Sequence, residues 1–328
     1  MRNYLFFRTD RIGDFLVSAI LMKSIKRNDI NSHLTVIASE KNYFYIKTLN
    51  FIDEVHLYPE NFIKKISFFI NISKSKYKAI FALDGKKRSI YFSIFLKSEQ
   101  KYLMTTKNIY KKILRNFFDH IYLFGEIKNK LDEIKNLLLK LKMNYKREDI
   151  NYLKDFKIDS KNIKIPSEYF IFHFDEKWIH NDYIKKYESI EPTNENLNLF
   201  VNKLIEKLDK NLVITTGIKN NDILNQYLKY FKKINDNVYE KEIYGKKIYI
   251  YKNINFFDLK LLIKYCNFII TCHGASTHLA SAFNKKIFDI YDKSQKEFYL
   301  KWNNHIQNYT HFYRESFDEL ANKILSKL

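Results

Sequence analysis

The chain has 328 residues, of which 46% are hydrophobic, 17% aromatic and 29% charged. A chain of this size exceeds what one hydrophobic core usually organises, so it predicts two α/β domains and argues against a disordered protein. The net charge of +20 predicts attraction to polyanions, meaning nucleic acid, an anionic membrane surface or a phosphorylated substrate.

The first half of the chain alternates short apolar runs with longer amphipathic stretches, which is the order of a βαβ fold. The predicted strands are residues 4–7, 34–38, 54–58, 79–83, 102–104 and 120–123, and the predicted helices are residues 14–26, 42–49 and 127–143. A charged stretch without apolar period follows between residues 145 and 166. This stretch predicts the connection between two domains.

The alternation resumes in the second half and predicts a second parallel sheet. The predicted strands are residues 169–173, 212–216, 247–250, 268–270 and 287–290, and the predicted helices are residues 196–208, 222–231, 256–265 and 276–283. We therefore expect an α/β protein of two Rossmann-like, doubly wound domains, residues 1–150 and 165–310, that face a central cleft. A C-terminal amphipathic helix, residues 316–328, is expected to pack across the domain boundary.

The N-terminal apolar stretch ends at Arg8 and is too short for a signal peptide or membrane anchor. The longest apolar run, residues 89–96, is far below the roughly 20 residues that span a bilayer. We expect a cytoplasmic protein whose membrane contact is peripheral, at the inner face of the cytoplasmic membrane. Cys266 and Cys272 lack the spacing of a redox or zinc pair and are expected to be reduced and structural.

Unusual residues gather directly after predicted strands, where open parallel sheets bind their ligands. Four of the six glycines lie at such junctions, namely Gly13, Gly85, Gly217 and Gly274. Polar residues at the same junctions are Arg8, Asp10, Arg11, Asp14, Asp84 and Lys86 in the first half, and His173, Lys177, Thr215, Thr216, His273 and His278 in the second. Turn chemistry and helix capping also explain any single junction, but their joint occurrence favours a site.

The most informative stretch is Thr-Cys-His-Gly-Ala-Ser-Thr-His, residues 271–278. It opens a helix directly after a buried strand, and its small residues Gly274, Ala275 and Ser276 let a ligand approach the free N–H groups and positive dipole of the helix end. Such an end can hold a diphosphate. In the alternative interpretation, Ser276 or Thr277 simply caps the helix.

Several motifs of other enzyme classes are absent from the sequence. The dinucleotide fingerprint G-x-G-x-x-G and the P-loop do not occur, which weighs against a dehydrogenase or a P-loop NTPase. No Asp-x-Asp pair is present to hold a metal–diphosphate complex, and His273 and His278 have a poor spacing for zinc. We therefore expect no metal and no cofactor, with the diphosphate held by a helix end.

Three segments resemble one known family. Arg-Thr-Asp-Arg-Ile-Gly-Asp, residues 8–14, is similar to the N-terminal motif of glycosyltransferase family 9, the lipopolysaccharide heptosyltransferases. Phe-His-Phe-Asp-Glu-Lys-Trp, residues 172–178, resembles the family's segment after the first strand of the C-terminal domain. His-Gly-Ala-Ser-Thr-His-Leu-Ala-Ser-Ala, residues 273–282, resembles its donor-binding loop and helix.

The resemblance implies the GT-B fold and an inverting transfer of a heptose or related sugar. The donor would be a nucleoside-diphosphate sugar, linked to ADP in the family, and the acceptor a lipopolysaccharide or lipooligosaccharide core or a similar glycan. By the resemblance, Asp14 is the catalytic base, Lys177 contacts the donor phosphate, and residues 274–278 hold the diphosphate and sugar. The remaining expected donor-binding residues are His173, Thr215, Thr216, Gly217 and His273, and the expected acceptor-binding residues are Arg8, Asp10, Arg11, Gly13, Asp84 and Lys86.

One departure from the family concerns the donor loop. Members commonly carry an acid before the loop glycine, whereas this chain has Cys272 and His273 there, and its loop is one residue longer. The departure bears on the identity of the donor sugar more than on the use of a sugar nucleotide.

Three other functions stay open at this stage. One is another GT-B enzyme, such as a sugar-nucleotide epimerase, and another is a GT-B scaffold without activity. The third is a basic nucleic-acid-binding protein, suggested by the charge and by 25 Tyr and 28 Phe. We expect no nucleic-acid partner, because these aromatics fall mostly on predicted strands and helix faces and no nucleic-acid motif is present.

Overall fold

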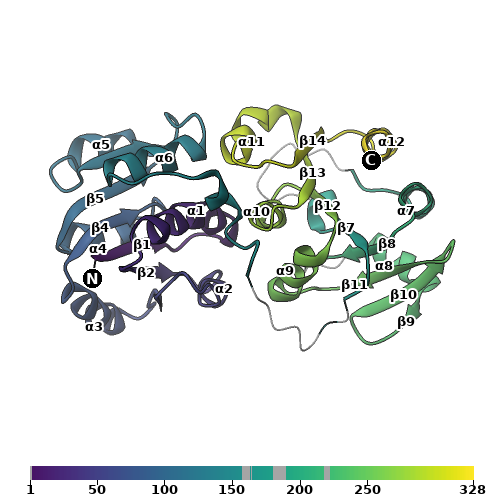
Figure 1. Ribbon diagram of the computed structural model, residues 1–328, viewed down its shortest axis with the longest axis horizontal. Coiled ribbons are helices and arrows are strands. Elements are labelled where there is room, and N and C mark those ends of the chain that lie inside the picture. The colour runs from purple at the N-terminus through teal and green to yellow at the C-terminus, as the bar shows by residue number, and fades with distance from the viewer. Residues whose placement is uncertain (1, 157–162, 164, 180–189, 218–221) are drawn as a thin grey trace. The chain divides into compact units, whose positions relative to one another are not determined.

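The computed structural model describes residues 2–156, 163, 165–179, 190–217 and 222–328. The chain divides into two compact units (Figure 1). Unit 1 comprises Met1–Tyr152 and Lys301–His305, and unit 2 comprises Leu153–Leu300 and Ile306–Leu328. The chain passes from one unit to the other at residue 153, inside the charged stretch that the sequence predicts as a connection.

Unit 1 is built on a six-stranded parallel sheet with the order β3-β2-β1-β4-β5-β6. Its strands are β1 (Arg2–Arg8), β2 (Ser32–Ala38), β3 (Glu54–Leu57), β4 (Tyr77–Ala82), β5 (Ser98–Thr105) and β6 (His120–Leu123). Its helices are α1 (Ile12–Asn28), α2 (Tyr43–Ile46), α3 (Phe62–Ser73), α4 (Lys87–Phe95), α5 (Asn108–Ile113), α6 (Lys130–Lys140) and the 3-10 turn η1 (Arg147–Asn151). The strand order reverses between β1 and β4, which makes their carboxyl ends the expected ligand position.

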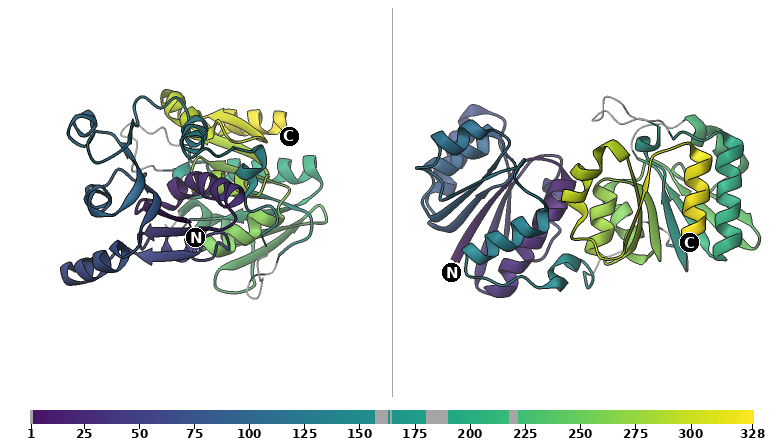
Figure 2. Two further views of the ribbon diagram at one scale, coloured as in Figure 1. Left: turned by 60° about the vertical axis from the view of Figure 1, so that its left-hand side comes forward. Right: turned by 90° about the horizontal axis from the view of Figure 1, so that it is seen from above.

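Helices cover both faces of this sheet. Helix α1 packs with α6 and η1 on one face, where Arg27 forms a salt bridge with the buried Asp149. The other face carries α3, α4 and α5: Phe68 and Phe92 belong to one apolar cluster with residues of β1 and β4, and Leu114 belongs to a second with β5. Figure 2 (left) shows these three helices, blue to teal, on the side of the sheet away from the purple α1.

Unit 2 is built on an eight-stranded sheet with the order β14-β13-β12-β7-β8-β11-β10-β9. Its strands are β7 (Tyr169–His173), β8 (Asn211–Thr215), β9 (Lys232–Lys233), β10 (Val238–Ile243), β11 (Lys246–Tyr251), β12 (Phe268–Cys272), β13 (Lys286–Tyr291) and β14 (Tyr309–Tyr313). Its helical segments are η2 (Glu176–Trp178), α7 (Asn194–Leu208), α8 (Asp222–Tyr227), η3 (Leu228–Tyr230), α9 (Phe256–Tyr265), α10 (Ala275–Ala282), η4 (Lys293–Gln295), α11 (Lys296–Asn303), whose C-terminal end falls in unit 1, and α12 (Phe317–Lys327).

The second sheet differs from the predicted parallel one at its edge. The six strands from β14 to β11 are parallel, but β10 pairs antiparallel with both β11 and β9. Only Tyr244 and Gly245 separate β10 from β11, and both have positive φ, which is the geometry of a tight hairpin turn. The Tyr-Gly pair between two strand-like runs is the signal that the sequence analysis missed.

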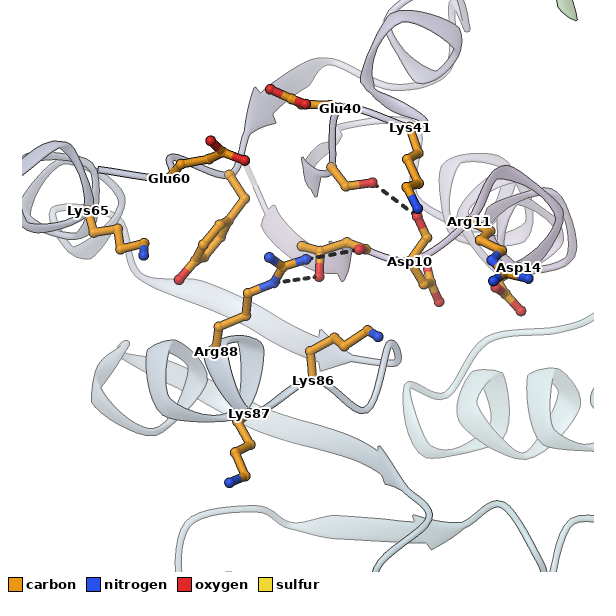
Figure 3. A pocket seen from close by; sticks show the side chains of 13 residues that line it. Asp10, Arg11, Asp14, Glu40, Lys41, Glu60, Lys65, Lys86, Lys87 and Arg88 are labelled. Carbon is orange, nitrogen blue, oxygen red and sulfur yellow. Dashed lines mark hydrogen bonds between the residues drawn. The ribbon is translucent and has the colours of Figure 1, made fainter. Parts of the chain in front are cut away.

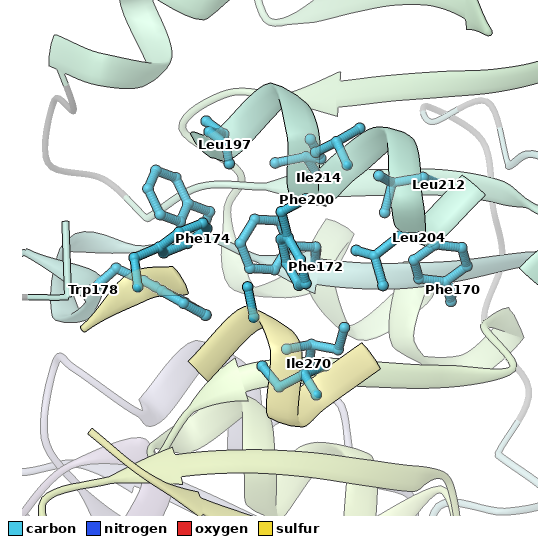
Figure 4. Packing of buried hydrophobic residues seen from close by; sticks show 14 of the residues in the cluster. Phe170, Phe172, Phe174, Trp178, Leu197, Phe200, Leu204, Leu212, Ile214 and Ile270 are labelled. Carbon is cyan, nitrogen blue, oxygen red and sulfur yellow. The ribbon is translucent and has the colours of Figure 1, made fainter. Parts of the chain in front are cut away.

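The core of unit 2 lies between the sheet and helices α7 and α12. Phe170 and Phe172 of β7 are fully buried, Phe172 lies beside Trp178, and Phe200 of α7 packs edge-on against Phe172 (Figure 4). Helix α12, which the sequence suggested would span the domain boundary, adds Phe317 to this same core, and it packs against α7.

Within the described part of the chain, no helix combines the length and the apolarity needed to cross a membrane.

Candidate functional site

A cavity of about 980 Å³ opens where the first four strands of unit 1 in chain order reach their carboxyl ends (Figure 3). The residues that line it are Thr9, Asp10, Arg11, Asp14, Ser39, Glu40, Lys41, Tyr58, Glu60, Lys65, Lys86, Lys87 and Arg88. Six of them are Lys or Arg and four are Asp or Glu. The sheet therefore collects charged side chains at the edge where the sequence predicts a site.

Four of the residues expected to bind the acceptor or act on it line this cavity, namely Asp10, Arg11, Asp14 and Lys86. Asp14 sits in the first turn of α1, close to Arg11 (Figure 3). Gly13 lies in that same turn and is not among the lining residues.

Asp84 connects residues of the cavity wall through hydrogen bonds and does not itself line the cavity. Its carboxylate accepts hydrogen bonds from Thr9 Oγ1 at 2.6 Å and from Ser89 Oγ at 2.7 Å. It also accepts from the backbone N–H of Lys86 at 3.1 Å. These bonds link the loop after β1 to the start of α4, so Asp84 fixes the relative positions of two segments that line the cavity.

Arg8 does not line the cavity, and only 2% of its surface is exposed. Its Nη1 donates to the Leu83 carbonyl at 2.9 Å, and its Nη2 forms a salt bridge of 2.6 Å with Asp10 Oδ2. Burial raises the pKa of Asp10 to about 7, against the opposing effect of the Arg8 guanidinium. Asp10 is therefore a carboxyl group of the cavity that exchanges its proton near neutral pH.

The structure adds residues that the sequence analysis did not single out. Arg88, at the start of α4, donates to Thr9 Oγ1 at 3.1 Å and to the Thr9 carbonyl at 3.0 Å, and its guanidinium lies 4.7 Å from the Tyr58 ring centroid. Lys65 of α3 enters from the opposite side of the cavity to Arg11 (Figure 3). Lys65 lies within α3 and follows no strand directly, so the junction rule could not find it; Arg88 lies six residues after β4, as Asp14 does after β1, and the same rule could have found it.

In unit 2, the neighbouring parallel strands β8, β7 and β12 carry polar residues in register at their carboxyl ends. Strand register places His173 of β7 between Thr215 of β8 and Thr271 of β12. His173 Nδ1 is hydrogen-bonded to Thr215 Oγ1 at 2.8 Å, and both side chains are buried. In the next residue, Thr216, Oγ1 accepts from the backbone N–H of Asn253 at 2.8 Å. Thr215 and Thr216 thus support the site from within the sheet.

Asp175 organises the turn after β7. It lies 3.5 Å from His173 Nε2 and 3.1 Å from Lys177 Nζ, and it also accepts from the backbone N–H of Lys177. Burial by itself would raise the pKa of Asp175, but the Lys177 ammonium and His173 hold it well below its usual range. In the same way, burial works against the charged Lys177, and the Asp175 carboxylate raises the pKa of that ammonium. Lys177 is therefore a fixed positive charge.

The Lys177 ammonium lies against the N-terminal end of α10. A Cβ added at Gly274, the N-cap of that helix, would collide with Lys177 Nζ. Ala275 is the first helical residue, and Gly274 itself has extended backbone. Only a residue without a side chain leaves room for the ammonium there. A positive side chain and the free N–H groups of a helix end thus meet at one point.

A second glycine, Gly217, also leaves room for a charged side chain. A Cβ at Gly217, which follows β8, would collide with the carboxylate of Glu176. Gly217 and Gly274 therefore each give space to a charged side chain of η2.

A buried carboxylate that the sequence did not mark holds the Thr277 hydroxyl of the loop. Asp289 of β13 is fully buried and accepts hydrogen bonds from Thr277 Oγ1 at 2.8 Å and from Tyr309 Oη at 2.8 Å. It also contacts His273 Nδ1 at 2.7 Å. Ser276 is hydrogen-bonded to Thr271 at 2.8 Å. The hydroxyls of Ser276 and Thr277 therefore fix the loop.

His278 and Arg314 complete the surroundings of this loop. The His278 ring packs edge-on against His273, with centroids 5.2 Å apart. Arg314 follows β14 and donates to the carbonyls of Lys177 at 2.8 Å and Trp178 at 3.2 Å. Arg314 is far from Lys177 in sequence, and no local pattern marked it.

Both cysteines are free thiols and buried, and burial raises their pKa, that of Cys266 to about 12. Among the residues that the structure describes, no three His, Cys, Asp or Glu side chains gather so that they could hold a metal ion.

The sequence matches no family model and no curated protein. The structure is similar to that of ADP-heptose lipopolysaccharide heptosyltransferase II from E. coli, with a TM-score of 0.66 and 11% identity over 100% of this chain and 97% of that one. It is also similar to a family 9 glycosyltransferase from Veillonella parvula, with a TM-score of 0.64 and 14% identity over 99% of this chain and 91% of that one.

The likeness to a UDP-GlcNAc 2-epimerase from Methanocaldococcus jannaschii is weaker, with a TM-score of 0.51 and 12% identity over 100% of this chain and 92% of that one. The chain thus has the α/β GT-B fold of the heptosyltransferases along nearly its whole length. The predicted fold class and the predicted likeness to glycosyltransferase family 9 are confirmed at the level of the fold.

Proposed function

We propose that this chain is a glycosyltransferase that moves a heptose or related sugar from a nucleoside-diphosphate donor to a lipopolysaccharide or lipooligosaccharide core or similar glycan. One observation carries the proposal: the Lys177 ammonium lies against Gly274 at the N-terminus of α10. A fixed positive charge beside free N–H groups suits a diphosphate. The shared fold with a heptosyltransferase that is named for ADP-heptose supports ADP as the nucleotide.

In the proposed reaction, Asp14 takes the proton of the acceptor hydroxyl, and the hydroxyl oxygen attacks the anomeric carbon opposite the diphosphate. The sugar passes through an oxocarbenium-like state and its configuration inverts. Negative charge grows on the leaving diphosphate, where Lys177 and the first N–H groups of α10 stabilise it. These groups supply the stabilisation that a metal ion supplies in other transferases, so we infer a metal-independent reaction.

The altered donor loop affects which donor sugar we expect. His273 stands where the family commonly carries an acid, and Asp289 fixes its ring through Nδ1. We infer that His273 takes over the contact with a sugar hydroxyl that the acid makes in the family. Because an imidazole reaches and orients differently from a carboxylate, the preferred sugar can be a relative of heptose.

The acceptor would bind in the cavity of unit 1. Arg11, Lys41 and Lys86 are among the six basic residues that line it, which suits an acceptor carrying phosphates or acidic sugars. From such an acceptor we infer that the enzyme works in the cytoplasm, at the inner face of the membrane. Asp14 in the same cavity is then within the site where the attacking hydroxyl must lie.

The test begins with thermal unfolding in the presence of ADP, UDP, GDP, CDP and CMP, each with and without magnesium at fixed salt. A ligand at 100 times its Kd stabilises by about 2.7 kcal/mol, which shifts the midpoint by roughly 4 °C for a chain of 328 residues. We expect a selective shift by one nucleoside diphosphate, equal with and without magnesium. No shift by any of them would reject the donor site.

Turnover then separates a transferase from an epimerase. With the matching nucleotide sugar, a transferase releases nucleoside diphosphate only when acceptor is added. An epimerase converts its nucleotide sugar without any acceptor. Conversion that is independent of acceptor would overturn the transferase assignment in favour of the epimerase.

A further inference from the structure

Helices α3, α4 and α5 of unit 1 carry large apolar side chains on their outward sides. We call this the α3–α5 surface. Its exposed members are Phe62, Ile63, Ile66 and Ile70 on α3, Tyr91 and Phe95 on α4, and Ile109, Ile113 and Phe117 on and just after α5. Their exposed fractions run from 47% to 75%. The surface is therefore a group of apolar residues on neighbouring elements rather than scattered single residues.

These exposed side chains lie outside the helix faces that pack against the sheet. Helix α3 packs onto the sheet through Phe68, Phe69 and Ile72, and it exposes a separate stripe in which Ile63, Ile66 and Ile70 recur at helical spacing. The two helices adjoin, since the Phe69 ring of α3 meets the Phe95 ring of α4 at 6.4 Å. Each helix is thus apolar toward the sheet and apolar outward as well.

The segment that contains these three helices carries more than half of the net positive charge of the chain. Residues 61–118 contain 14 Lys and Arg against 2 Asp and Glu, a net charge of +12 out of +20 for the whole chain. Neither acid faces the apolar side chains, since Asp84 bonds to Thr9 and Ser89 and Glu99 pairs with Lys78. Of the helix lysines, Lys111 is paired with Glu126. Exposed basic residues such as Lys64, Lys74 and Lys112 stand among the apolar ones.

We propose that the α3–α5 surface docks unit 1 onto an anionic phospholipid bilayer. The apolar side chains would enter the headgroup region while the surrounding Lys and Arg face lipid phosphates, the combination by which amphipathic helices lie in a membrane interface. Charge complementarity favours an anionic occupant, and the exposed apolar side chains favour a lipid one. Nucleic acid fits the surface less well, because five of the nine exposed apolar residues are isoleucines, which cannot stack on bases as aromatic rings do.

The position of the surface connects it with the cavity. Lys65 of α3 and Lys87 of α4 line the cavity, so the helices that would touch the bilayer begin at the edge of the candidate acceptor site. An acceptor anchored in the same bilayer would then present its headgroup there. This last step rests on the proposed function, whereas binding to the bilayer does not.

The experiment is co-sedimentation of the full chain with vesicles of phosphatidylcholine alone or of phosphatidylcholine mixed with phosphatidylglycerol. The test variant combines I63S, F95S and I113S. Its matched control combines L199S, Y244S and F257S, three large apolar residues of unit 2 that are also exposed. None of these six residues lines the cavity or belongs to the donor loop.

We expect the wild type and the control variant to bind the phosphatidylglycerol vesicles, and the test variant to bind them at least about tenfold more weakly. Binding of phosphatidylcholine alone should be much weaker for all three. The proposal would be overturned if the wild type did not bind the vesicles, or if both variants lost vesicle binding equally. It would also be overturned if binding were the same with and without phosphatidylglycerol.

Two further measurements keep the result unambiguous. Nucleoside-diphosphate binding should be unchanged in the test variant, so a failure of the membrane proposal is distinguishable from a failure of the proposed function. Sedimentation velocity without lipid tests the other occupant, a second copy of the chain. A wild-type dimer that becomes a monomer in the test variant and does not bind vesicles would assign the surface to self-association instead.

Discussion

Replacing Gly274 by alanine isolates the contribution of the Lys177 ammonium to ligand binding. Gly274 has extended backbone that any residue adopts, so alanine brings no backbone strain of its own. Its methyl group would collide with Lys177 Nζ, the flexible end of a side chain, which has to move by about 1 Å to reach van der Waals separation. The fold should therefore survive while the ammonium is displaced from the end of α10.

The expected loss follows from charge and distance. Moving a unit charge from about 4 Å to about 5 Å from a phosphate oxygen costs about 0.8 kcal/mol at an effective dielectric constant of about 20, or roughly fourfold in Kd. Loss of the direct charge-assisted hydrogen bond raises the cost to about 1.5–3 kcal/mol, or roughly 10- to 150-fold. We thus expect nucleoside-diphosphate affinity to fall by at least about fourfold and up to about 150-fold.

The assay is calorimetric titration with the nucleoside diphosphate selected by thermal unfolding and with its parent nucleoside. Nucleoside affinity should hardly change, because a nucleoside carries no phosphate to face Lys177. The control is Gly125→Ala, where a Cβ has no atom within 4 Å and should change nothing. If Gly274→Ala behaves like the control, or loses nucleoside and diphosphate binding equally, the role assigned to Lys177 is wrong.

Four further predictions concern catalysis, pH and stability. Asp14→Asn should lower turnover by about 10²–10⁴-fold with the melting temperature kept, and a loss within about tenfold would remove its role as base. The pKa of Asp10 near 7 means that a negative charge appears in the cavity as pH rises through neutrality, so the KM for an anionic acceptor should rise above pH 7; Asp10→Asn should abolish that rise. Because Asp175 has a pKa below its ordinary 3.8, its stabilising effect is complete above that pH and is lost as the pH falls below it. Urea unfolding at pH 6 and pH 3 should show this loss in the wild type, and an equal loss in Asp175→Asn would contradict it. Phe172→Ala should lower the free energy of unfolding by about 3–5 kcal/mol, measured by urea unfolding, and a cost under about 1 kcal/mol would mean that the core closes over the cavity.

All the parallel strands except β14, and the glycine junctions, were predictable because they depend on local pattern. Buried parallel strands read as short apolar runs, and the residue that follows each strand falls at the ligand edge of the sheet by topology alone. That is why Asp10 and Asp14 in unit 1, and His173 and Gly274 in unit 2, could be placed at strand ends without coordinates. The hairpin of β10 and β11 was missed because its turn signal, Tyr244 and Gly245, was not used.

Other parts of the site depend on contacts between residues that are distant in the chain. Asp289 holds the donor loop from a neighbouring strand, and Arg314 donates to the Lys177 carbonyl across 137 positions. A buried aspartate within an apolar strand and an arginine after a strand have no distinguishing local pattern. Their roles appear only when the strands are paired in register.

The sequence by itself therefore determined the αβ alternation, the likeness to one fold, and the small-residue loop that begins α10, since each is encoded within a few consecutive residues. Only the tertiary structure decided that Lys177 meets Gly274, that Arg8 and Asp84 bond to residues of the cavity without lining it, and which of the two apolar sides of α3 faces outward. The physical reason is that an apolar period shows which residues share a helix face, but the packing of the other elements decides which of those faces is covered.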